Sequence, residues 1–315
     1  MSEPTAPSAP HRPEGVRYSP VGFAFASLAI VFVLYQFVGG GITLLLAGGS
    51  ITTDNVMLAR GATMVAQFLF LLIPTVWLVQ RQHGALSAAL SFRMPSATEA
   101  VLSILGMVAL LQAAEGYIHF QGKIPLPESI VPFVEQIKKM IEETYRVLVE
   151  ARSVPELIFV IIVVSVTPAI CEEVLFRGLV QKNLSLAVNA KRGFIVTGII
   201  FGLYHFNPFH AVPLIALGIY FSFLQYRSRT LLIPMIAHFV NNSVSVVASY
   251  VYGYSSSDIP TFMQGEAEAI NDGTVAMTML LFLVIFGVVM KMYLRSTDHL
   301  VHEPSPAVLD KAETV

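Results

Sequence analysis

The sequence contains only one cysteine, Cys171, so the chain can form no internal disulfide and no metal site from paired cysteines. It is also poor in charge: 13% of its residues are charged, whereas an ordinary soluble domain has about 25%. The net charge is -2 and there is no basic tract, so nothing in the sequence suggests a nucleic-acid partner. The single cysteine excludes a small fold held together by disulfides, and the low charge excludes an ordinary soluble domain.

Apolar residues are correspondingly abundant in this sequence. They make up 55% of the chain, and the mean hydropathy is +0.67. Long apolar runs of this kind predict an all-α fold, a polytopic membrane helix bundle. We expect about eight transmembrane helices, at residues 21–47, 61–79, 97–120, 155–187, 193–206, 209–226, 230–252 and 274–294.

Polar segments divide the chain around these helices. The expected parts are a disordered cytoplasmic tail (1–20), three N-terminal transmembrane helices (21–120), a linker with an amphipathic helix (121–154), four transmembrane helices with the candidate catalytic residues (155–254), an external loop (255–273), the eighth helix (274–294) and a second cytoplasmic tail (295–315).

The distribution of lysine and arginine predicts how the bundle is oriented in the membrane, because positive residues are more frequent on the cytoplasmic side. With the N-terminus inside, the inner segments hold twelve of these residues, and the outer ones hold Arg60 and five more in the linker 121–154. We therefore expect both termini in the cytoplasm.

The linker contains an amphipathic pattern. Val134, Ile137, Ile141, Tyr145 and Leu148 recur at helical spacing, and charged residues occupy the other faces. The pattern predicts a helix that lies on the membrane surface or packs over the bundle. A substrate lid is the alternative.

The stretch VTPAICEEVLFRGLVQ, residues 166–181, places two carboxylates and an arginine inside an expected transmembrane helix. A charged side chain at the bilayer centre costs ~2.5 to 3.5 kcal/mol even on the mildest scale, so such residues usually mark pathways or catalytic sites. Glu173 and Arg177 stand four residues apart and can pair on one helix face, whereas Glu172 points about 100° away. One glutamate is therefore expected to be paired and the other to be available.

Two later helices carry further groups suited to proton chemistry. His205 follows Phe201 by four residues in FGLYH, and Asn242 follows His238 by four in HFVNN. From the rise per residue, Glu172 lies ~21 Å, His205 ~18 Å and His238 ~15 Å from the inner ends of their helices. We therefore expect these groups to meet at a similar depth.

This set of residues suits amide hydrolysis. A carboxylate beside an imidazole can deprotonate a water molecule, and a histidine with an asparagine amide can donate hydrogen bonds to the developing oxyanion. Other intramembrane protease chemistries are poorly supported, because the chain has no H-E-x-x-H motif and no G-x-S near a membrane histidine, and its five aspartates lie outside the expected helices.

Three motifs in order resemble a known family. EEVLFR fits E-E-x-x-x-R, FGLYH fits F-x-x-x-H and HFVNN fits H-x-x-x-N. Together they resemble the CPBP family of intramembrane proteases, which includes CAAX prenyl endopeptidases and bacteriocin-processing or immunity relatives. The resemblance covers residues 155 to about 250 and agrees with an eight-helix bundle, whereas the first three helices, the amphipathic helix and both tails have no specific match.

The resemblance implies roles for four of these residues in water activation. Glu172 would be the general base that acts on the attacking water together with His205. Glu173 and Arg177 would orient that pair.

It also implies that His238 and Asn242 form the oxyanion hole. A zinc site is the open alternative for part of the set, because Glu173, His205 and His238 are also suitable zinc ligands. We favour activation of water by glutamate and commit to no metal or other cofactor.

The sequence thus predicts an intramembrane endopeptidase with a cavity open to the cytoplasm. Its partners would be the lipid bilayer and a membrane-anchored protein or peptide as substrate. The segment HFNPF and the Pro-rich N-terminus resemble bacterial members, which places the protein in a bacterial plasma membrane and speaks against a farnesylated substrate. A non-catalytic bacteriocin-immunity or scaffold protein of the same fold is one alternative. A proton-coupled transporter is another, and the lack of an apparent inverted repeat counts against it.

Overall fold

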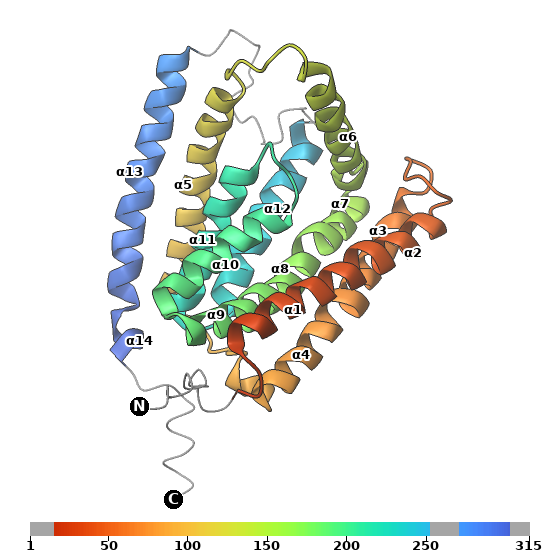
Figure 1. Cartoon of the computed structure of the whole chain (residues 1–315). Helices are drawn as coiled ribbons and strands as arrows, with labels where there is room; N and C mark the ends of the chain where they lie inside the picture. The colour runs from red at the N-terminus through yellow and green to blue at the C-terminus, as the bar shows by residue number, and fades with distance from the viewer. Residues whose placement is uncertain (1–15, 253–270, 303–315) are drawn as a thin grey trace, which may run out of the picture.

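A computed structural model describes residues 16–252 and 271–302 (Figure 1). Every secondary-structure element in these ranges is a helix, so the predicted all-α bundle is confirmed. Most of the two predicted tails and of the predicted external loop 255–273 lies outside the described residues.

Six helical runs in the described chain are long and apolar enough to cross a membrane. Each begins within a few residues of an expected span, and π-helical turns join the helices inside the first, second and fourth runs. In chain order the runs consist of α1 (Pro20–Phe32) and α2 (Gly40–Leu46); α3 (Val56–Ala66) and α4 (Ile73–His83); α5 (Ala97–Gln121); α7 (Val154–Ile161), α8 (Thr167–Glu173) and α9 (Lys182–Ala187); α12 (Leu232–Tyr252); and α13 (Asp272–Ser296).

The remaining two expected spans are the shorter helices α10 (Ala190–Tyr204) and α11 (Ala211–Ser228), which form a hairpin in the bundle (Figure 1). α10 has 15 residues, so it rises about 22 Å. The hydrocarbon core of a bilayer is about 30 Å thick. α10 by itself is therefore shorter than that core is thick. Among the described helices, six meet both the length and the hydropathy expected of a crossing, compared with the eight spans predicted.

Glycines let the backbones of α10 and α11 come into contact. A Cβ atom on Gly198 would lie 2.3 Å from the backbone nitrogen of Ile219, and one on Gly202 would lie 2.5 Å from that of Ile215. On the opposite helix, a Cβ atom on Gly218 would lie 2.4 Å from the carbonyl oxygen of Gly198. Small residues spaced four apart commonly allow such close packing between membrane helices. The contact fixes the end of α10, and with it the His205 side chain, against α11.

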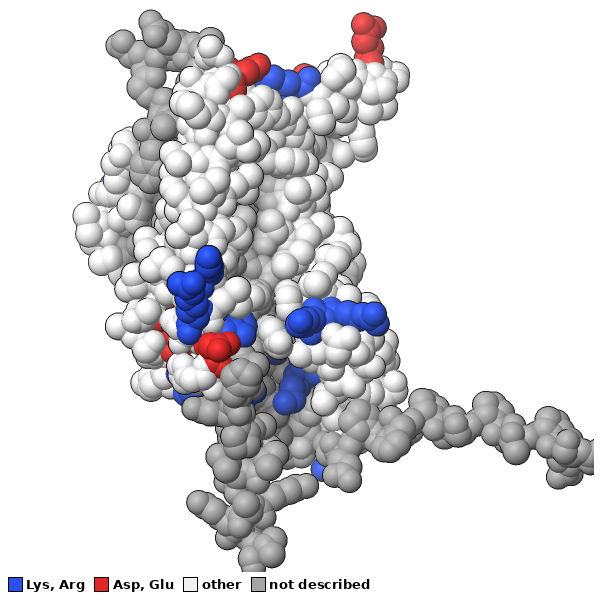
Figure 2. All heavy atoms as spheres, turned by 90° about the vertical axis from the view of Figure 1, so that its left-hand side faces the viewer, with Lys and Arg blue, Asp and Glu red and all other residues white. Residues whose placement is uncertain are grey.

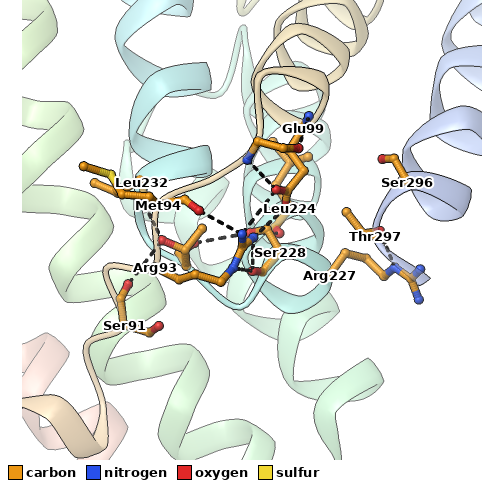
Figure 3. A network of polar contacts seen from close by, with 12 residues as sticks. Ser91, Arg93, Met94, Glu99, Leu224, Arg227, Ser228, Leu232, Ser296 and Thr297 are labelled. Carbon is orange, nitrogen blue, oxygen red and sulfur yellow. Dashed lines mark hydrogen bonds and ion pairs between the residues drawn. The ribbon is translucent and has the colours of Figure 1, made fainter. Parts of the chain in front are cut away.

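A polar network joins α5, α11 and α13 at one end of the bundle (Figure 3). The Arg93 guanidinium donates to both carboxylate oxygens of Glu99 and to the carbonyl of Ser228, at 2.9 Å from Nη2. Arg227 donates from Nη2 to the carbonyl of Leu294 at 2.6 Å. The segment before α5, the turn after α11 and the end of α13 are therefore held together at one end of the bundle.

The amphipathic helix expected in the linker is α6 (Val131–Val149), which lies at the end of the bundle opposite α14 (Asp298–His302) (Figure 1). Val149 is its one fully buried residue. Arg60 on α3, only 1% exposed, donates to the carbonyl of Leu148 at 2.9 Å and pairs with Glu156 on α7 at 2.7 Å. Arg60 therefore fastens the C-terminal end of α6, while the rest of the helix is half-buried or exposed.

The outer surface matches a membrane setting. On the face shown in Figure 2, charged side chains gather towards the two ends and an uncharged zone separates them. On α13 several large apolar side chains are more than half exposed: Met277, Leu280, Leu281, Val284 and Val288. Exposed apolar surface of this extent is suited to lipid. The chain is an integral membrane protein.

Candidate active site

The centre of the bundle contains an ion pair with no solvent exposure. Nη1 of Arg177 lies 2.8 Å from Oε1 of Glu173, and both side chains are 0% exposed. The four-residue spacing predicted this pair. Because an unpaired buried charge is strongly unfavourable, each residue stabilises the ionised form of the other.

Aromatic rings enclose the Arg177 guanidinium. Its carbon Cζ lies 4.5 Å from the ring centroid of Phe201, 5.4 Å from that of Phe221 and 5.8 Å from that of Phe176. Nη2 donates to the carbonyl of Gly218 on α11 at 3.2 Å. A desolvated guanidinium over ring faces gains cation–π stabilisation, so Arg177 links the helix that carries the glutamates to both arms of the α10–α11 hairpin.

His238 on α12 joins this pair. Its Nδ1 lies 2.8 Å from Oε1 of Glu173, and its ring stacks on Phe221 with centroids 5.2 Å apart and an interplanar angle of 18°. Glu173, paired with Arg177, is ionised and can only accept hydrogen bonds, so Nδ1 of His238 carries a proton. Nε2 is then the nitrogen that remains for a ligand or a substrate.

His205 directly follows α10 and is exposed. Its Nδ1 lies 2.8 Å from the carbonyl oxygen of Phe201, and the two rings are in contact at 4.6 Å between centroids. A carbonyl only accepts, so the Nδ1 proton is used in this bond and the lone pair of Nε2 is free. An exposed imidazole with a free Nε2 is suited to take up a proton.

Asn242, one turn beyond His238, contacts the helix that carries the glutamates. Its Nδ2 donates to the carbonyl of Val164 at 2.9 Å, and its Oδ1 accepts from the side chain of Asn241 at 2.9 Å. Val164 lies in a π-helical turn four residues before Pro168, which has no N–H to donate to that carbonyl. One N–H of the Asn242 amide therefore compensates for the proline, and the second N–H has no partner among the described residues.

Glu172 faces a different environment from Glu173, as the helical geometry predicted. It is half-buried, and its Oε2 atom is buried without a hydrogen-bond partner among the described residues. The hydroxyls of Tyr35 and Tyr204 are close enough to interact with its charge. Tyr204 also donates to the carbonyl of Leu28 at 3.2 Å. The available carboxylate thus lies near two tyrosines that the motifs did not include.

The predicted residues fall into one contact group and three neighbours. Glu173, Arg177 and His238 are joined directly by hydrogen bonds. His205 is joined to them through the Phe201 ring, which lies 6.0 Å from that of His238. Glu172 and Asn242 flank the group through their own helices. Among the described residues, no hydrogen bond or ion pair joins Glu172 to His205.

The alternative zinc set of Glu173, His205 and His238 is not assembled in this arrangement. No three His, Cys, Asp or Glu side chains in the described part of the chain are grouped so that they could hold a metal ion. The Oε1 atom of Glu173 is already engaged by Arg177 and His238. This arrangement of the three side chains does not fit a zinc ion.

Comparisons with known proteins agree with the motifs. Residues 154–244 match the family model described as "Type II CAAX prenyl endopeptidase Rce1-like". A protein of Bacillus subtilis (strain 168) called "Putative membrane peptidase YdiL" is 27% identical over 201 residues, which are 64% of this chain and 77% of that protein. No solved structure matched the chain. The predicted resemblance to the CPBP family of intramembrane proteases is thereby confirmed: the candidate site residues, from Glu172 to Asn242, all lie in the segment that is similar to the Rce1-like family model.

Proposed function

We propose that this protein is an intramembrane endopeptidase that cleaves a membrane-associated protein or peptide with a water molecule activated by Glu172 and His205. The observation that supports this proposal best is the contrast between the two glutamates. Oε1 of Glu173 accepts hydrogen bonds from both Arg177 and His238, whereas the adjacent Glu172 has no hydrogen bond to the described residues. The Oε2 atoms of both glutamates are buried without a partner. Buried acceptors are normally satisfied, so an unsatisfied one next to such a network suggests a functional site.

Glu172 would act as the general base. Its carboxylate takes a proton from water as the water oxygen attacks the carbonyl carbon of the scissile peptide bond. The proton is then given to the leaving amine nitrogen as the C–N bond breaks, which returns Glu172 to its ionised form. His205, through the free lone pair of Nε2, would relay this proton from Glu172 to the leaving amine nitrogen.

His238 and Asn242 would stabilise the negatively charged oxygen of the tetrahedral intermediate. Asn242 would use its second amide N–H, because the first is bound to the carbonyl of Val164. His238 would have to be protonated on both nitrogens to donate from Nε2 while Nδ1 stays bonded to the carboxylate of Glu173. Hydrogen bonds aimed at the developing charge are usually a large contribution to such catalysis.

Arg177 and Glu173 would keep these donors in place. Arg177 holds Glu173 and the backbone of α11, and Glu173 fixes the ring of His238. Neither residue needs to contact the substrate in this scheme, because their role is to position His238 and the helices that carry the site.

The surroundings of His205 suit an apolar substrate segment. Leu203 is 56% exposed and Phe206 68% exposed, and both lie directly beside His205 in the chain. An apolar peptide or a lipid-anchored tail would cover these side chains when its scissile bond reaches the histidine. We therefore propose a membrane-anchored protein tail or peptide as the substrate class, with no commitment to a prenyl group.

The test is a comparison of membrane-protein termini in cells that express the wild type or the Glu172→Ala variant at equal levels. The proposal predicts new termini with the wild type that are absent with the variant, and these would identify substrates directly. If the two sets of termini are identical while a cellular phenotype of the wild type persists in the variant, the protein acts as a scaffold and the proposal is wrong.

A further inference from the structure

A second polar cluster lies around Glu172 and comes from the first two membrane runs, outside residues 154–244. Tyr35 belongs to the π-helical turn Val33–Gly39 between α1 and α2. Gln67 begins the π-helical turn Gln67–Leu72 between α3 and α4. Such widened turns inside helices are frequent at functional sites.

These turns pack at the helix that carries the glutamates. The two turns are in contact with each other, and the second one also contacts α8. Close approach is possible because of Gly39, where a Cβ atom would lie 3.1 Å from that of Ala66. In this interface the Tyr35 hydroxyl is close enough to interact with the side chain of Gln67 and with the charge of Glu172. Tyr35 is therefore near both the amide of Gln67 and the carboxylate of Glu172.

Two buried acceptors in this cluster have no partner. Gln67 is 7% exposed, and its Oε1 makes no hydrogen bond to the described residues. Oε2 of Glu172 is in the same situation. Leaving a buried acceptor unsatisfied is costly, so these atoms require a donor that the described protein does not supply. A buried water molecule typically has two to four polar partners, and it has two protons to donate.

We propose that Tyr35, Gln67 and Glu172 together bind the water molecule that attacks the substrate. The water donates one proton to Oε2 of Glu172 and the other to Oε1 of Gln67, and its oxygen accepts a hydrogen bond from the Tyr35 hydroxyl. Its second lone pair is left to attack the peptide carbonyl as Glu172 takes the proton. The inference rests on the proposed peptidase function and adds two catalytic residues from outside the matched domain.

The experiment measures cleavage of a membrane-anchored fluorogenic peptide by excess purified enzyme in nanodiscs. The variants are Tyr35→Phe, Gln67→Met, Gln67→Glu and Glu172→Gln. Tyr226→Phe is the matched control, because it also removes one hydroxyl from a half-buried tyrosine, whose ring stacks on Phe194 at 5.3 Å on the α10–α11 hairpin. The saturating rate constant, the half-saturating enzyme concentration and the melting temperature are determined for each.

Loss of one hydrogen bond to the water predicts that Tyr35→Phe and Gln67→Met each lower the saturating rate constant about 10- to 100-fold. For both variants the half-saturating concentration and the melting temperature stay at the wild-type values. Gln67→Glu retains more activity than Gln67→Met, because glutamate keeps acceptor oxygens. The Tyr226→Phe control cleaves at the wild-type rate. A wild-type rate for Tyr35→Phe, or a rate loss matched by a lower melting temperature, would overturn the inference. The peptidase function survives that result if Glu172→Gln is inactive, and fails only if Glu172→Gln cleaves normally.

Discussion

Asn242 donates its side-chain amide to the carbonyl of Val164 at 2.9 Å, across the contact between α12 and the helix that carries the two glutamates. Pro168 lies four residues after Val164 and leaves that carbonyl without its helical donor. Asn242 therefore has a structural partner in addition to the proposed oxyanion. The two roles use different N–H groups and can be separated by experiment.

Replacement of Asn242 by Ala is expected to lower the rate of peptide cleavage by ~10²- to 10³-fold, because one oxyanion donor is lost. Substrate binding should be retained, which binding measurements on the purified variant would check. The control is the double variant Pro168→Ala, Asn242→Ala, which gives Val164 a backbone donor again. If this second substitution restores cleavage, Asn242 acts only through Val164 and the oxyanion assignment is wrong.

Replacement of Arg177 by Ala is expected to lower both the melting temperature and activity. The substitution leaves Glu173 buried and unpaired, and breaking such a pair typically costs ~3 to 5 kcal/mol. It also removes the cation from the rings of Phe201 and Phe221. His205→Ala is the comparison, since His205 is exposed and should affect cleavage alone. Equal melting temperatures for the two purified variants would contradict this account.

Replacement of Gly202 by Val is expected to destabilise the protein and to reduce cleavage, because its side chain would meet the backbone of Ile215. Overpacking at such a contact typically costs about 1 to 3 kcal/mol or more. Gly287→Val on α13 serves as the control, since a Cβ atom there has no neighbour within 4 Å. Similar thermal stability of the two variants would show that the hairpin can separate without loss of the site.

The orientation of the bundle also has a direct test. The lysine and arginine distribution predicts both termini in the cytoplasm, so a reporter fused after Leu294 should report the cytoplasmic side and one inserted near Ser256 the opposite side. Both positions flank α13, the run with the highest mean hydropathy among the described helices. Reports from the same side would show that α13 does not cross the membrane.

Local features of the site could be predicted from the sequence. The four-residue spacing of Glu173 and Arg177 predicts their ion pair, because helical neighbours are determined by periodicity. The same geometry predicts that Glu172 faces elsewhere. The helical runs were also predictable, since apolar stretches of this length have few alternatives in a membrane.

Contacts between helices could not be predicted in the same way. Periodicity indicates which face of a helix a residue occupies, but not which helix packs there. Phe221 and Gly218 on α11 complete the surroundings of Arg177, and no motif included them. Tyr35 and Gln67 near Glu172 were missed for the same reason. The spacing of Gly198 and Gly202 was the one available signal, because it indicates close packing of α10 against another helix.

The most direct test of the central claim is single-turnover cleavage of a membrane-anchored peptide by the purified Glu172→Gln variant in nanodiscs, with wild type and Glu172→Asp assayed beside it. The amide of glutamine keeps the size of the side chain but cannot accept a proton from water. The account predicts no detectable cleavage by Glu172→Gln at a wild-type melting temperature, and reduced but measurable cleavage by Glu172→Asp. Cleavage by Glu172→Gln at the wild-type rate would contradict the assignment of Glu172 as the base and the enzymatic mechanism built on it.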